Sequence, residues 1–409
     1  MPEPRRLPRY EPGPGAAGLA ARLKALLDGD HPVRCDTYVD LGAPSAFSSH
    51  HAETTFTLAE AVVAGRAGEL SKFNSKPATV TRPYALASRG RADVMALDPA
   101  DPPEDIDQGL WHEVRERARL RRFRDPTEAA AVSQLLLRLG FLRAALDTLQ
   151  LRPVDLRSFR PDDAIATEQL HLLARASGDL APLRELLFTL MTDRRYSPYS
   201  RATMAKQFVV SAGRRNLWED RLLAAEAELL EVSEAMPDDF AGNLYRQTIF
   251  RAVSFVPFLR GDRERTIAYL TSAEECQLRA VPSTGLEFLL WRDYAFPLYE
   301  TLHRTAEVHG DRQLALRSAE KLIAISPGDY RAWIAHLRLR FDLGDLDGAL
   351  RSAERAIDLG GFSVAQAAFY ASVIAQESGD GAAALRYRST AARLDPDSPS
   401  LSVAVADLA

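Results

Sequence analysis

The sequence predicts an all-α protein, in which a right-handed solenoid of helical hairpins follows a smaller N-terminal region of mixed α/β or irregular structure. From about residue 125 onward, amphipathic helical patterns follow one another, separated by short glycine-containing turns. The turn glycines Gly310, Gly344 and Gly379 lie 34 and 35 residues apart, a period typical of stacked helix–turn–helix units. With 46% hydrophobic and 26% charged residues, the composition is that of a globular chain.

The first 125 residues lack the helical period and form a separate N-terminal region in this interpretation. Its predicted elements are a proline-rich flexible arm (1–15), a short helix (16–28), a strand (33–41), a second helix (55–67) and a hairpin (79–97). The proline-rich stretch 98–103 then reads as a linker. We therefore expect two domains, 1–125 and 126–409.

The repeat domain opens at Asp125-Pro126-Thr127-Glu128, which has an N-cap residue, a proline at the first helical position and a glutamate at the third. Seven glycines mark the expected turns: Gly140, Gly178, Gly213, Gly261, Gly310, Gly344 and Gly379. The intervals that end at Gly261 and Gly310 exceed the period, and each contains a proline, Pro257 or Pro297. Prolines inside helices predict kinks or breaks there, so we expect six or seven irregular hairpins.

The last three units share a set of residues at equivalent positions. Each has a Gly-Asp turn followed by an alanine–leucine pair, as in Ala349-Leu350, and the last unit closes with Leu394-Asp395-Pro396. Over 296–396 this pattern resembles the tetratricopeptide repeat (TPR) family. The resemblance implies an adaptor or regulatory scaffold that binds a protein or peptide partner on the concave face of the solenoid, without catalysis by the repeats.

The resemblance also implies which residues face that groove. Carried over by their offset from each turn glycine, they are Gln207, Arg251, Phe255, Phe258, Arg304, Glu307, Arg338 and Phe341. Arginine and aromatic residues are common in interface hot spots. Phe255 and Phe258 lie near Pro257 and fit a packed core equally well. The Lys/Asn arrangement with which some family members hold a terminal carboxylate is absent.

An alternative hypothesis is an enzyme, or an accessory subunit of one, that modifies a peptide or small metabolite through a metal or polar site around His31–Glu53. Five candidate ligands fall within this segment: His31, Cys35, Asp36, His50 and His51. Imidazole, thiolate and carboxylate groups suit transition metals. Surface histidines explain the cluster more simply, because the P-C-x-x-C motif that accompanies H-x-E in zinc deaminases is missing. We therefore predict no metal and favour a non-enzyme, while the enzyme hypothesis stays open.

Two further motifs fail as cofactor or metal sites. Gly13-Pro14-Gly15-Ala16-Ala17-Gly18 fits G-x-G-x-x-G, but no strand precedes it to aim the turn at a pyrophosphate. The pairs Glu168–His171 and Glu300–His303 resemble di-iron ligands, but they occupy equivalent places in distant repeats and cannot share a metal. We predict no cofactor.

Charge and hydropathy limit the partners. The net charge of −5 argues against nucleic acid, so a DNA-binding regulator is the weakest hypothesis. No segment is apolar enough for a membrane span or an export signal. We expect a cytoplasmic protein with a protein or peptide partner. An oligomer is possible, because the sequence does not determine the oligomeric state.

Overall fold

The structure, a computed structural model, describes part of the chain. The described residues are 180–402 apart from 214, 284, 326, 328–329 and 360–363, together with 7–11, 13 and scattered positions between 123 and 170. They belong to two compact units. The central unit contains the described residues of 123–301, and the C-terminal unit contains those of 302–402 with 7–11 and 13.

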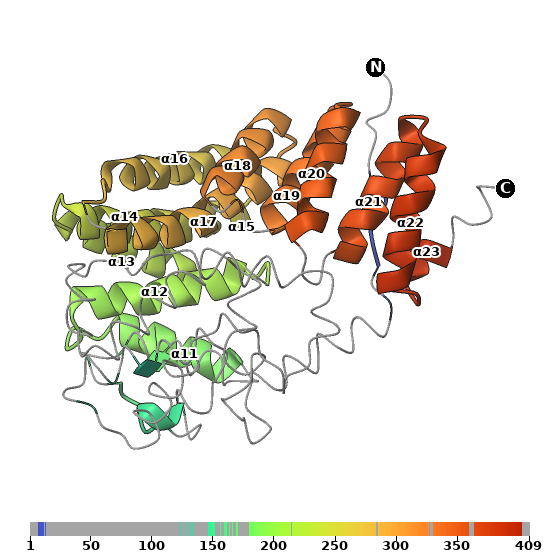
Figure 1. The fold of residues 1–409 in the computed structure, drawn as a ribbon. Helices are drawn as coiled ribbons and strands as arrows, with labels where there is room; N and C mark the ends of the chain where they lie inside the picture. Colours follow the sequence, from blue (N-terminus) through green and yellow to red (C-terminus); the bar gives the residue numbers. More distant parts are fainter. Residues whose placement is uncertain are drawn as a thin grey trace. The chain divides into compact units, whose positions relative to one another are not determined.

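In each unit the described residues form α-helices that pack against their neighbours along the chain, in agreement with the predicted all-α helical-repeat fold (Figure 1). In the central unit the helices are α11 (Leu180–Met191), α12 (Pro198–Gly213), α13 (Arg221–Ala235), α14 (Phe240–Val253), α15 (Phe255–Leu259), α16 (Arg263–Arg279) and most of α17 (Gly285–Val308). The C-terminal unit continues with α18 (Arg312–Ile325), α19 (Tyr330–Asp342), α20 (Leu346–Leu359), α21 (Val364–Glu377), α22 (Gly381–Leu394) and α23 (Pro399–Ser402). The hairpins α12–α13, α14–α16, α19–α20 and α21–α22 each pack as a pair, and we call the first member of each pair the first helix.

Four of the turns between helices are built by the same Gly-Asp pair. Gly261, Gly310, Gly344 and Gly379 have φ between 70° and 83°, a left-handed conformation that glycine adopts without steric cost. In each turn the glycine amide donates to the carbonyl three residues earlier, and the aspartate amide donates to the carbonyl five residues earlier, which ends the helix. The aspartate carboxylate then accepts from the amide three residues ahead and caps the next helix.

Two turns have the same backbone pattern without glycine. Asn216 and Gln150 have φ of 52° and 56°, and the Asn216 amide donates to the Gly213 carbonyl at 3.3 Å. The turn predicted at Gly213 is therefore wrong, because Gly213 is the last residue of α12 and the turn residue is Asn216. A Cβ on Gly213 would lie 2.5 Å from the Phe255 ring, so close packing explains this glycine. Gly140 and Gly178 lie outside the described residues.

The prolines in the long units have different effects. Pro257 lies within the short helix α15, which follows α14 after a single intervening residue, Ser254. Proline has no amide to continue the α14 hydrogen-bond ladder, so the predicted break is present. Helix α17 runs through Pro297 without interruption from Gly285 to Val308.

The cores of the two units differ in side-chain size. Phe208, Leu190 and Leu229 are fully buried in the central unit. The C-terminal core is rich in buried alanines, including Ala349, Ala353, Ala368, Ala371 and Ala391, and such small residues let paired helices approach closely. None of the described helices is long and apolar enough to cross a membrane.

A hydrogen-bonded histidine joins α19 to α20 within the C-terminal unit. His336 Nδ1 lies 2.8 Å from Ser352 Oγ, and Arg340 Nε donates to His336 Nε2 at 3.1 Å. Burial, and then the charge of Arg340, lower the pKa of His336. The imidazole is therefore neutral at neutral pH, which leaves Nε2 free to accept this hydrogen bond.

Candidate partner-binding surface

Two neighbouring first helices, α12 and α14, carry a polar and aromatic group that we call the Lys206 cluster. Its members are Tyr199, Thr203 and Lys206 on α12, and Tyr245 and Thr248 on α14. The rings of Tyr199 and Tyr245 stack with centroids 4.4 Å apart. The Tyr245 hydroxyl donates to the Tyr199 carbonyl at 2.9 Å and lies 3.0 Å from Thr203 Oγ1. These contacts fix the Tyr245 ring beside the Lys206 ammonium.

The Lys206 ammonium is held by neutral groups. Nζ donates to Thr248 Oγ1 at 3.0 Å and lies 3.9 Å from the centroid of the Tyr245 ring, a cation–π contact. Among the described residues, no carboxylate pairs with this ammonium, whereas the charge of Arg251 repels it. Burial, and then Arg251, lower the pKa of Lys206 to about 7. The cluster is therefore a half-buried cationic site to which the described residues supply no counterion.

The other predicted groove residues of the central unit lie on α12, α14 and α15. Gln207 and Arg251 are half-buried on α12 and α14. Phe255 packs against the hydrophobic core of the central unit, and Phe258 is half-buried on α15. Of the alternatives left open for Phe255, the structure favours core packing.

In the C-terminal unit, the predicted groove residues separate into exposed and buried positions. Arg304 and Glu307 are exposed on α17, and Arg338 is exposed on α19. Phe341 is only 3% exposed and packs in the core of the C-terminal unit. Its assignment to the groove is therefore wrong, because a buried ring cannot contact a partner.

His303, from one of the Glu-x-x-His pairs, has a structural environment. Its Nδ1 lies 3.2 Å from the Ala315 carbonyl and its Nε2 lies 3.4 Å from Glu307 Oε2, so it connects α17 to α18. The described residues contain no group of His, Cys, Asp and Glu arranged to hold a metal. The candidate ligands His31, Cys35, Asp36, His50 and His51, as well as the pair Glu168–His171, lie outside the described residues.

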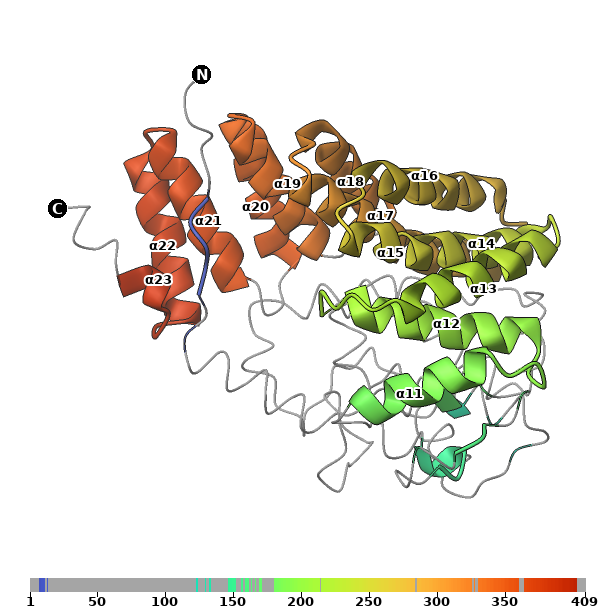
Figure 2. The ribbon, with the colours of Figure 1, turned by 180° about the vertical axis from the view of Figure 1, so that it is seen from behind.

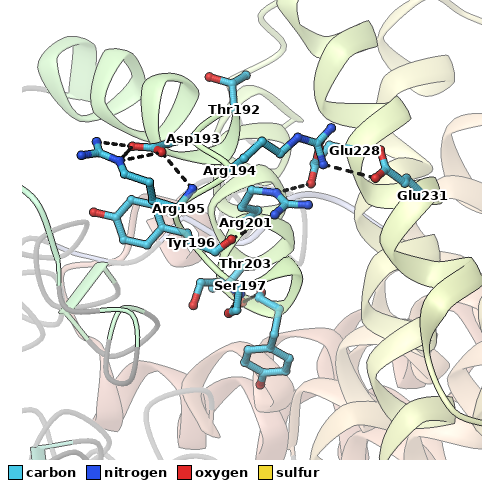
Figure 3. A network of polar contacts seen from close by, with 12 residues as sticks. Thr192, Asp193, Arg194, Arg195, Tyr196, Ser197, Arg201, Thr203, Glu228 and Glu231 are labelled. Atoms are coloured by element: carbon cyan, nitrogen blue, oxygen red, sulfur yellow. Dashed lines mark hydrogen bonds and ion pairs between the residues drawn. The ribbon is translucent and has the colours of Figure 1, made fainter.

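A buried ion pair holds α12 against α13 (Figure 3). Arg201 on α12 is 5% exposed and Glu228 on α13 is 9% exposed, and Arg201 Nε donates to Glu228 Oε1 at 2.7 Å. Arg201 also donates to the Tyr196 carbonyl at 3.0 Å. Arg194, which precedes α12, reaches Glu228 at 3.7 Å and Glu231 at 3.2 Å. Because α12 is fixed in this way, the Lys206 cluster is held in place before any partner binds.

Lys206, Tyr199 and Tyr245 were absent from the sequence prediction. One signal was available, since Lys206 is one of five lysines among 51 basic residues. The offset of 42 residues that pairs Thr203 with Tyr245 and Lys206 with Thr248 is visible only in the structure.

Comparisons with known proteins give no family. The sequence matches no protein-family model and no curated protein. Among solved structures, a monomeric IFIT1 mutant with Gppp-AAAA has a TM-score of 0.37 and 11% identity over 91% of this chain and 78% of its own. Human IFIT1 dimer with m7Gppp-AAAA has a TM-score of 0.31 and 11% identity over 85% and 89%. The APC/C hetero-tetramer Cut9-Hcn1 has a TM-score of 0.25 and 13% identity over 94% and 93%. At these values the similarity carries no argument about ligand or activity.

Proposed function

We propose that this chain is a binding scaffold that holds a protein or peptide partner on the face formed by α12 and α14, with Lys206 receiving an acidic group of that partner. The observation that carries the proposal is the cationic Lys206 cluster, which has no counterion within the described part of the chain. A half-buried ammonium beside a second cation is electrostatically unfavourable. A carboxylate or phosphate from a partner would supply the missing negative charge through a charge-assisted hydrogen bond.

The aromatic members of the cluster suit the same role. Tyr199 is 49% exposed, although its ring is already oriented by stacking on Tyr245. A tyrosine that is held in place contributes contact area at little cost in side-chain entropy. The arrangement therefore combines one charged contact with an aromatic surface, as peptide-binding faces require.

The experiment selects ligands for the full chain from a random displayed peptide library and repeats the selection with Lys206→Met. The matched control is Lys321→Met, which removes an exposed lysine from α18. We expect acidic peptides that bind wild type and Lys321→Met but lose most of their affinity for Lys206→Met. Their affinity should fall as the pH rises above about 7, because deprotonation of Lys206 removes the charge that they neutralise.

Two outcomes would contradict the proposal. One is a set of peptides whose binding ignores the change at Lys206. The other is preferential binding of a 5′-phosphorylated single-stranded RNA, tested in parallel and lost with Lys206→Met, which would replace the protein partner with nucleic acid. The net charge of −5 describes the whole chain and does not exclude a local cationic site of this kind.

A further inference from the structure

Residues 7–11 and 13, which we call the 7–13 segment, lie on the C-terminal unit as an extended peptide. Figures 1 and 2 show this segment, in blue, beside α21 in both views. The sequence prediction of a flexible arm is therefore wrong for these residues. Their contacts come from α21 and from the residues around α23.

Tyr10 anchors the segment. It is 9% exposed, its ring centroid lies 5.5 Å from that of Phe369, and Leu7 packs on the same hydrophobic cluster. Its hydroxyl donates to Asp395 Oδ2 at 2.6 Å. Burial, and then the hydrogen bond to Asp395, raise the pKa of Tyr10, so the hydroxyl keeps its proton and remains the donor.

Asp395 is a buried carboxylate that faces the segment. It is 3% exposed, and its Oδ2 accepts both from the Tyr10 hydroxyl and from the Gly13 amide at 2.9 Å. A carboxylate buried without donors is costly. The 7–13 segment therefore supplies the side-chain hydrogen bonds that make the burial of Asp395 tolerable.

Two further contacts are hydrogen bonds between serine side chains and the backbone of the segment. The Glu11 amide donates to Ser400 Oγ at 2.7 Å, and Ser398 Oγ donates to the Glu11 carbonyl at 2.6 Å. At Gly13 an added Cβ would lie 2.5 Å from Asp395 Oδ1 and 2.6 Å from the Asp397 carbonyl carbon. The surface therefore requires a glycine at that position and accepts many side chains at position 11, which is exposed.

We propose that this surface, formed by Phe369, Asp395, Ser398, Ser400 and Leu401, is a peptide-binding site that the chain fills with its own 7–13 segment. The ligands that it fits are extended peptides with an aliphatic residue three positions before a tyrosine and a glycine three positions after it. These are the features that the surface contacts in Leu7, Tyr10 and Gly13. The prolines at positions 8 and 12 restrict the backbone of such a peptide before binding and lower its entropic cost.

Because the 7–13 segment already occupies the site, only peptides that bind more strongly than this segment gain access to it. A tethered segment competes intramolecularly, at an effective concentration set by the chain that joins it to the site, so a partner peptide must displace it to bind. This site does not involve the Lys206 cluster, which lies on α12 and α14, and either proposal can fail without the other.

The experiment measures the fluorescence anisotropy of a labelled peptide with the sequence of residues 5–15 on the full chain. Tyr10→Ala removes the anchor of the 7–13 segment and leaves the residues of the surface unchanged. We expect Tyr10→Ala to bind the peptide at least about tenfold more tightly than wild type, because the competing segment has lost its anchor. Arg9→Ala, which changes an exposed neighbour, is the matched control and should bind like wild type.

The recognition itself is tested in the Tyr10→Ala chain. Adding Asp395→Asn, or replacing the tyrosine of the peptide with phenylalanine, should weaken binding about tenfold, since each change disturbs the hydrogen bond to a charged group. Equal affinity of wild type and Tyr10→Ala, or indifference to both changes, would overturn the proposal.

Hydrogen exchange in the wild-type chain provides a second measurement if Tyr10→Ala fails to fold. The Glu11 and Gly13 amides are hydrogen-bonded to Ser400 and Asp395, so excess unlabelled peptide should accelerate their exchange by displacing the segment. Unchanged exchange at saturating peptide would likewise overturn the proposal.

Discussion

The ion pair between Arg201 and Glu228 makes a quantitative prediction about how α12 is held. Both side chains are buried, and Glu228 Oε1 accepts from Arg201 Nε at 2.7 Å. Glu228→Ala leaves the Arg201 guanidinium in the same buried place, where it still donates to the Tyr196 carbonyl at 3.0 Å. Removing one partner of a buried pair destabilises proteins by about 3–5 kcal/mol, mostly because the remaining charge is uncompensated.

The assay is hydrogen–deuterium exchange of α12 and α13 in the full chain, because it reports the opening of these helices separately from the C-terminal unit. A loss of about 3–5 kcal/mol accelerates exchange roughly a hundredfold to a few thousandfold. Glu231→Ala is the matched control, since Glu231 lies one turn further along α13 and pairs with the same Arg194 at 3.2 Å. Exposed pairs contribute at most about 1 kcal/mol, so this control should differ little from wild type.

The two variants together test whether burial determines the free energy lost when one partner of an ion pair is removed. Similar exchange in Glu228→Ala and Glu231→Ala would refute it, because the loss of a buried partner would then cost no more than the loss of an exposed one. A double change, Arg201→Met with Glu228→Leu, should recover most of the lost protection, since apolar replacements leave no charge to compensate.

Three further predictions concern titration and turn geometry. In a pH titration of the Cε NMR signals of labelled lysines, Lys206 should show a midpoint near 7. Between pH 7 and 10.5 the folded chain then binds fewer protons than the unfolded chain, so the free energy of unfolding should rise with pH across that range. In Lys206→Met this rise should be absent. Gly379→Ala, at φ 80°, should lower the free energy of unfolding by about 1 kcal/mol, whereas Gly381→Ala, where an added Cβ meets nothing within 4 Å, should be neutral or slightly stabilising in urea titrations. Acidification below pH 6.5 should lower the unfolding free energy of the C-terminal unit, because His336 takes up a proton more readily in the unfolded chain than in the folded one; His336→Gln should remove this dependence in urea titrations at pH 7.5 and 5.5.

The parts of the fold that depend on local sequence were predictable. The Gly-Asp pair sets its own backbone conformation and caps the next helix, so the turns at Gly310, Gly344 and Gly379 follow from adjacent residues. The turns at Gln150 and Asn216 escaped the prediction because residues other than glycine also adopt the left-handed conformation at a modest energetic cost.

The candidate site was predictable only in part, because it depends on which helices meet. Counting from turn glycines gave Arg251 and Gln207, which lie near Lys206, but the same count gave the buried Phe341. Tyr199 and Tyr245 come together through the packing of α12 on α14, which no local pattern encodes. The contact of Tyr10 with Asp395 joins residues 385 positions apart, and a proline-rich stretch has the same sequence pattern whether it is free or bound.

The placement of the 7–13 segment has a consequence for the order of folding. During synthesis these residues are made hundreds of positions before Asp395, so Tyr10 has no acceptor until the last helical hairpin has been translated and folded. Contacts of such large sequence separation form late, after the entropy of closing the intervening chain has been overcome. The contact between Tyr10 and Asp395 therefore forms only after residue 395 has been synthesised, and a chain that stops before Asp395 leaves Tyr10 without its hydrogen-bond acceptor.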